Sequence, residues 1–135
     1  MVERYRNKIS GPLLDRIDLH VKVNAVPIHE LQEKPAGESS LVVRARVLKA
    51  RKIQLERQHT CNNELQGQAL ETHCFLNDVT RKLLAHAMDQ LQLSARAYNR
   101  ILRVARTIAD LEGGVSIQSS HISEALAYRN LDRPI

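Results

Sequence analysis

The segment from Leu93 to Gly113, LSARAYNRILRVARTIADLEG, constrains the fold more than any other part of the chain, because it predicts one long helix. Ser94 is a good N-cap, since its hydroxyl can accept a hydrogen bond from a backbone N–H of the first turn. Glycine is common just after a helix, where the backbone is left-handed. Apolar residues recur at helical spacing between these ends and predict a buried face: Tyr98, Ile101, Leu102, Ala105, Ile108 and Ala109.

Arginines dominate the other face of this predicted helix. Arg96 falls in the first turn, where the helix dipole disfavours a cation by roughly 0.3–1 kcal/mol, so this end favours an anion such as phosphate. A solvated arginine without a ligand is the simpler interpretation. Arg100 and Arg103 share the face of Arg96, and Arg106 lies at its edge. Asp110 stands near the negative end of the dipole, again an unfavourable place, so the charges favour a partner rather than helix stability.

Length and composition indicate one mainly α-helical domain. The chain has 135 residues, enough for one core but short for two. It has one Phe and no Trp, so the core must be aliphatic, and its net charge of +5 is compatible with a nucleotide or nucleic acid partner. No apolar run is long enough for a membrane span, and the N-terminus has no signal-peptide core. Cys61 and Cys74 are therefore expected to be free thiols of a cytoplasmic protein.

The first 26 residues predict a short helix and one strand. Pro12 can open a helix that ends at Asp15 or Arg16. Residues 18–26, DLHVKVNAV, alternate apolar and polar side chains, which predicts a strand with one buried face. A lone strand leaves its backbone groups and apolar side uncovered. We expect its sheet to lie outside this chain; pairing between two copies is the alternative.

The rest of the chain predicts a small bundle of about four helices. They cover residues 40–58, 77–91, 94–112 and 119–128, whereas residues 60–76 look irregular apart from one possible helical turn. We therefore divide the chain into a poorly ordered segment, 1–38, and a helical domain, 39–135. Basic side chains are frequent on two of these helices, and such faces either bind nucleic acid or are simply solvated. The candidate DNA-binding residues are Arg44, Arg51, Arg100, Arg103 and Arg106.

A complete active site is not visible in the sequence. None of the five glycines belongs to a phosphate-binding loop, and no acidic pair for Mg²⁺ follows a hydrophobic strand. A zinc site from His59, Cys61, His73 and Cys74 is conceivable but lacks the paired spacing of zinc ligands, so we expect no metal site. The pair Asp15–Arg16 is either a helix-end salt bridge or the source of an exposed arginine that stabilises phosphoryl charge.

Three strings carry a family resemblance: SGPLLDRIDLHVKV, LSARAYNRILRVARTIADLEG and HISEALAYRNLDR. Together they resemble the C-terminal part of the YifB/ComM family, the magnesium-chelatase-like AAA+ ATPases of bacteria. The resemblance covers nearly the whole chain except the linker at about 27–40. It implies that residues 1–38 are the end of an AAA+ core and that residues 39–135 are the helical C-terminal lid.

The resemblance also implies roles for two arginines. Arg16, in LLDRID, matches an arginine finger that acts in trans on the nucleotide of the neighbouring subunit. Arg96, in LSARAY, matches the lid arginine called sensor 2, which reaches the γ-phosphate of ATP. The implied partners are the rest of the AAA+ core, neighbouring subunits of a homo-oligomeric, hexameric ring, and DNA during branch migration in natural transformation.

The resemblance leaves the cofactors outside this fragment. ATP and Mg²⁺ belong to the full-length protein, since the phosphate loop and the Mg²⁺-binding acid are not in this chain, and we expect no tight binding or hydrolysis by the fragment alone. Two other interpretations stay open: a basic helical module that binds DNA without a nucleotide role, and a bundle that only binds proteins.

Overall fold

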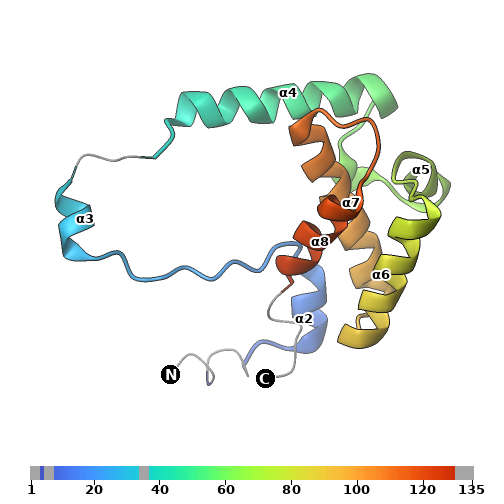
Figure 1. The fold of residues 1–135 in the computed structure, drawn as a ribbon, viewed down its shortest axis with the longest axis horizontal. Coiled ribbons are helices and arrows are strands. Elements are labelled where there is room, and N and C mark those ends of the chain that lie inside the picture. Colours follow the sequence, from blue (N-terminus) through green and yellow to red (C-terminus); the bar gives the residue numbers. More distant parts are fainter. Residues whose placement is uncertain (1–3, 5–7, 34–36, 130–135) are drawn as a thin grey trace.

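The computed structural model describes residue 4, residues 8–33 and residues 37–129, and this part of the chain is mainly helical (Figure 1). The described residues contain no β-strand. No helix among them is long and apolar enough to cross a membrane. In chain order the helices are α2 (Gly11–Arg16), α3 (Ile28–Gln32), α4 (Ser40–Gln58), the 3₁₀ helix η1 (Asn62–Glu64), α5 (Gly67–His73), α6 (Asp78–Leu91), α7 (Ala95–Glu112) and α8 (Ser119–Ala127).

Helix α7 is the centre of the bundle, and its predicted ends are confirmed. The Ser94 hydroxyl accepts a hydrogen bond from the Ala97 backbone N–H at 3.2 Å, and Gly113 closes the helix with a φ of 75°. Helices α2, α4, α5 and α8 and the 3₁₀ helix η1 all contact α7. The core is aliphatic, as expected, and its most completely buried large apolar side chains are those of Leu65, Leu84, Ile101, Ile117 and Ile122.

The four predicted helices of the bundle are present, with two differences nearby. The last helix is capped by Gln118 rather than Ser119 or Ser120, and the His121 ring accepts from the Gln118 backbone N–H at 2.8 Å. Helix α5 lies in the stretch predicted to be irregular. It opens at Gly67 with a φ of 54° and no side-chain cap, so the sequence carries none of the usual start signals.

The predicted strand over residues 18–26 is wrong. In the described part of the chain, this segment makes one isolated parallel bridge, between His20 and Arg129. Beyond it the backbone runs as an open arm to α3, and Val21 and Val23 are 67% and 86% exposed (Figure 1). Alternation predicts a strand only where a neighbouring strand accepts its hydrogen bonds, and the described residues supply none.

Amide exchange tests the state of this arm. The Val21 and Val23 amides should exchange roughly a thousandfold or more faster than the Ile101 amide, because exposed segments open at little free-energy cost whereas core helices open only with the fold. The His20 amide, which donates to the Tyr128 carbonyl, is an internal control and should exchange more slowly than Val21. Protection of Val21 and Val23 equal to that of Ile101 would show that the arm pairs with a strand in solution.

Candidate functional site

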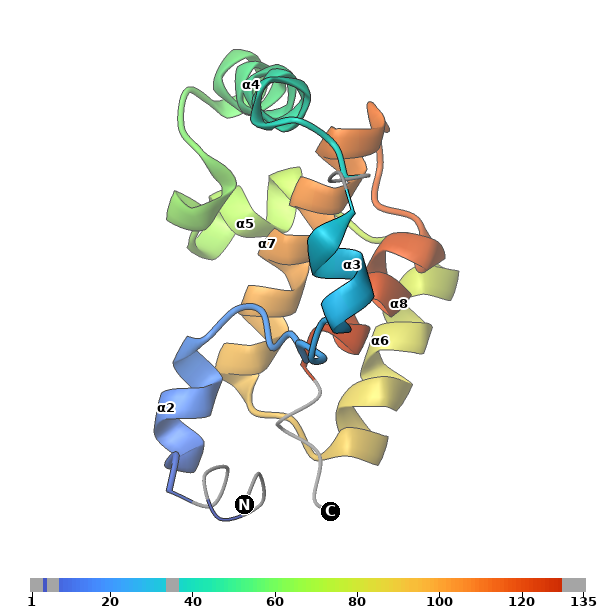
Figure 2. The same ribbon diagram turned by 90° about the vertical axis from the view of Figure 1, so that its left-hand side faces the viewer.

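The N-terminal end of α7 lies against α2, and a side-chain hydrogen bond joins them. The Ser94 hydroxyl donates to Asp15 Oδ2 at 3.2 Å while it caps α7. Figure 2 shows α2 beside the first turns of α7. A small cavity of about 380 Å³ between them is lined by Gly11, Pro12, Leu14, Asp15 and residues 92–94. Asp15 therefore places a carboxylate at the positive end of the α7 dipole, where an anion is favourable.

Arg16 and Arg96 both lie close to this hydrogen bond. Arg16 follows Asp15 in the last turn of α2, and Arg96 is the second residue of α7 after the Ser94 cap. Both residues are exposed. No acidic residue stands in the first turn of α7. The two arginines predicted from the sequence are thus brought to one end of the bundle, beside the N-terminus of its central helix.

Three of the candidate DNA-binding arginines are engaged with the protein itself. Arg100 pairs with Asp18 at 2.6 Å, and Arg103 donates to the Leu65 carbonyl at 2.9 Å. Arg106 is a correction to the sequence analysis: it is buried, so its guanidinium does not face the surface where a DNA backbone would lie. The loop that follows α7, at Gly114 and Val115, covers the Arg106 side chain.

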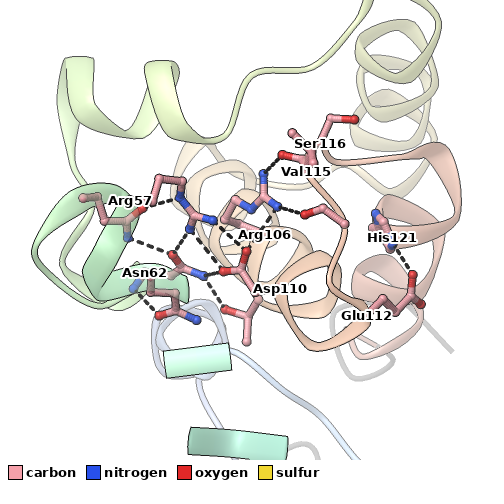
Figure 3. A network of polar contacts seen from close by, with 12 residues as sticks. Arg57, Asn62, Arg106, Asp110, Glu112, Val115, Ser116 and His121 are labelled. Atoms are coloured by element: carbon pink, nitrogen blue, oxygen red, sulfur yellow. Dashed lines mark hydrogen bonds and ion pairs between the residues drawn. The ribbon is translucent and has the colours of Figure 1, made fainter. Parts of the chain in front are cut away.

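Arg106 belongs to a buried ionic network centred on Asp110 (Figure 3). The Asp110 carboxylate accepts from Arg57 at 2.7 and 3.1 Å and from the Asn62 side-chain amide at 3.0 Å, and it lies 3.1 Å from Arg106. Arg106 also donates to the carbonyls of Gly114 and Val115. Burial lowers the pKa of the Arg106 guanidinium, and the Asp110 charge acts in the opposite direction.

This network explains the unfavourable charges at the end of α7. Asp110 opposes the helix dipole, but its partners are Arg57 of α4 and Arg106, inside the protein rather than on a ligand. Glu112, in the same position relative to the dipole, accepts from the His121 ring of α8 at 2.6 Å (Figure 3). The charge pattern at this end of α7 therefore serves the contacts with α4 and α8.

The sequence analysis did not identify Arg129, whose side chain joins α2 to the bundle through hydrogen bonds. Arg129 is buried and donates to the Ile17 carbonyl at 3.0 Å and the Leu14 carbonyl at 3.5 Å, and its guanidinium lies 3.9 Å from Asp15. These carbonyls belong to the C-terminal end of α2, where a cation is favourable. Arg129 thereby positions the helix that carries Arg16.

The described residues contain no group of three or more His, Cys, Asp or Glu side chains that could hold a metal ion. Cys61 and Cys74 are both free, as expected. Burial raises the pKa of the Cys74 thiol to about 11, which makes it a poor nucleophile at neutral pH.

Comparison with known families identifies the chain. Residues 37–129 match the family described as magnesium chelatase, subunit ChlI C-terminal, and residues 1–31 match the family described as magnesium chelatase, subunit ChlI. This chain belongs to the magnesium chelatase ChlI family. The ChlI C-terminal match covers α4 through α8, which contain Arg96 and the Asp110 network, and the ChlI match contains Arg16.

Relatives of this ChlI-family chain confirm the resemblance to YifB and ComM. Competence protein ComM of Haemophilus influenzae is 47% identical over 133 residues, which are 98% of this chain and 26% of that protein. Uncharacterized protein YifB of Salmonella typhimurium is 41% identical over 131 residues, and its Escherichia coli counterpart is 40% identical over 131 residues. The two YifB matches each cover 96% of this chain and 26% of the relative. The chain therefore spans about a quarter of the length of all three relatives.

Proposed function

We propose that this chain is the end of an AAA+ core followed by its helical lid, and that it supplies Arg16 and Arg96 to ATP in a DNA-processing motor of the YifB/ComM type. Arg96 would act as sensor 2 on the γ-phosphate, and Arg16 as an arginine finger toward the neighbouring subunit. Arginines in these roles stabilise charge that develops on the transferred phosphoryl group.

One observation carries this proposal. Arg16 and Arg96 are both exposed, and the hydrogen bond between Asp15 and Ser94 holds their helices together. No ion pair or hydrogen bond joins either guanidinium to another described residue, in contrast with Arg57, Arg100, Arg103 and Arg106. Asp15 already supplies one carboxylate at this end of α7, and the two exposed arginines without a protein partner leave their charge available to an anionic ligand.

The proposed function needs segments that this chain does not contain. A phosphate loop and a Mg²⁺-binding acid would come from the longer polypeptide, and the trans role of Arg16 requires neighbouring subunits in a ring. ATP hydrolysis is therefore expected from the longer, assembled protein and not from this chain alone. The name of one relative, competence protein ComM, supports a role in natural competence. The branch-migration step rests on the family resemblance.

Mixing subunits tests whether Arg16 acts in trans. In the longer protein, Arg16→Ala subunits and subunits with a disabled phosphate loop should each lose most of their ATPase turnover. Mixing them in equal amounts should restore turnover to about a quarter of wild type, because one interface in four pairs an intact loop with an intact Arg16. Arg81→Ala, at an exposed arginine paired with Asp78, is the matched control and should keep full turnover. No recovery on mixing would contradict the trans role.

DNA contact by this region remains a second candidate, now restricted to α4. Arg44 and Arg51 are exposed and make no ion pair with the described residues, whereas Arg100, Arg103 and Arg106 are held by the bundle. Binding through phosphate contacts would weaken steeply as salt is raised.

A further inference from the structure

Helix α4 has apolar residues on two opposite sides, although the bundle covers only one of them. Ala50 and Gln54 are buried where α4 crosses α7, and Val43 and Val47 continue that side toward the N-terminal half, which reaches beyond the bundle (Figure 1). Leu41, Leu48 and Leu55 are seven residues apart, so they form a line along the opposite side. We call these three residues the leucine stripe.

The leucine stripe is open to solvent along its length. Leu41, Leu48 and Leu55 are 78%, 52% and 42% exposed, respectively. A shallow depression of about 600 Å³ runs along this side and is lined by Leu48, Arg51, Lys52, Leu55, Glu56 and His59. Three leucines in line on one helix are apolar anchors of the kind that a docked amphipathic helix uses, whereas single scattered exposed leucines need no explanation.

The flanks of the leucine stripe are positively charged. Arg44 and Arg51 follow one edge, and Lys52 follows the other, where Glu56 lies 3.8 Å from it. Arg44 and Arg51 make no ion pair with any described residue. Arg46, which lies on another side of α4, shows the contrast, because Glu38 binds it through two hydrogen bonds of 2.7 and 2.6 Å. The stripe therefore presents an apolar centre with unneutralised cations beside it.

These charges decide between the possible occupants. A second copy of α4 would place Arg44 against Arg44 in a parallel pair, or Arg44 against Lys52 in an antiparallel pair centred on Leu48, and like charges at such positions oppose pairing. A DNA backbone would neutralise Arg44 and Arg51 but would leave the three leucines in water. A helix with a leucine seam and acidic flanks satisfies both the apolar centre and the cations.

We propose that the leucine stripe of α4 is a docking site for an amphipathic helix of a partner protein, one whose apolar seam is flanked by Asp and Glu. The leucines provide the buried contact, and Arg44 and Arg51 select acidic partners over basic ones. This surface is separate from Arg16 and Arg96, which lie at the N-terminal end of α7, so the docking site stands independently of the ATPase role.

A designed peptide tests the proposal directly on the 135-residue chain. The probe is a fluorescein-labelled helical peptide of 21 residues, with leucine at seven-residue spacing and glutamate on both flanks, titrated by fluorescence anisotropy. Saturable binding is expected. Leu48→Ser should weaken it about tenfold or more, since central apolar contacts dominate such interfaces. The double variant Arg44→Glu, Arg51→Glu should weaken it by a similar factor, and the same peptide with lysine in place of glutamate should not bind.

Two controls keep the test specific. Val115→Ser removes an almost fully exposed apolar side chain elsewhere and should leave the affinity unchanged. Leu48 is half exposed, so Leu48→Ser should keep the circular dichroism spectrum and melting temperature of the parent chain. Absence of saturable binding would overturn the proposal, as would binding that Leu48→Ser leaves intact. Leu48-dependent dimers in sedimentation would assign the stripe to a second copy, and duplex DNA binding that displaces the peptide would assign it to nucleic acid.

Discussion

Arg96→Ala is expected to lower kcat for ATP hydrolysis about a hundredfold to a thousandfold in the longer polypeptide that carries this region. The guanidinium is exposed in the first turn of α7, next to the Ser94 cap. In the proposed sensor 2 role, a cation there would add to the positive end of the helix dipole and would stabilise the negative charge that develops as the γ-phosphate leaves. The measurement is steady-state ATPase activity, with kcat and KM determined separately.

Two further variants separate this role from a structural one. Arg96→Lys keeps the charge but loses the planar donor pair, so it should recover only part of the turnover. Arg81→Ala removes an exposed arginine of α6 and should leave kcat unchanged. Because Arg96 is exposed, Arg96→Ala should not lower the melting temperature of the isolated chain. Wild-type turnover in Arg96→Ala would remove this residue from the nucleotide site.

The helices of the bundle could be predicted because their signals are local. In α7 the cap, the apolar period and the final glycine all lie within one stretch of sequence, and Asn77 caps α6 in the same way, accepting from the Thr80 backbone N–H at 2.8 Å. Arg16 and Arg96 were also proposed from local signals, one from a helix end and one from a short motif. Their shared location depends on Asp15 and Ser94, which are 79 residues apart in the chain.

The features that sequence analysis missed depend on distant partners. Asp110 looked unfavourable because its partner Arg57 lies 53 residues earlier in the chain, on another helix. Arg106 was assigned to a basic face from its spacing along the helix. That spacing could not show that the loop at Gly114 would cover the Arg106 side chain. The strand over 18–26 was predicted from an alternation of apolar and polar residues, but in the described structure this segment pairs only through one isolated bridge, between His20 and Arg129.

Asp110→Ala is expected to destabilise the isolated chain by about 3–5 kcal/mol, the usual effect of removing one partner from a buried ionic network. The Asp110 side chain is fully buried, and the Arg106 side chain is only 3% exposed. Without the carboxylate, Arg57 and Arg106 would face each other with no counter-charge, and the Asn62 side chain would lose an acceptor. Urea unfolding measures the change as a lower midpoint.

Second-site and surface variants show whether unpaired buried charge is the cause. Asp78→Ala breaks an exposed ion pair with Arg81 and should change stability by less than about 1 kcal/mol. The double variant Asp110→Ala, Arg106→Met also removes the buried cation that Asp110→Ala leaves unpaired. It should recover part of the lost stability, because replacing a whole buried ion pair with apolar residues is often neutral. If Asp110→Ala were as mild as Asp78→Ala, the network would not be what holds α4 against α7. The position of α4 would then depend on other contacts, such as the burial of Ala50 and Gln54 and the hydrogen bond from the Asn62 backbone N–H to the Gln54 side chain.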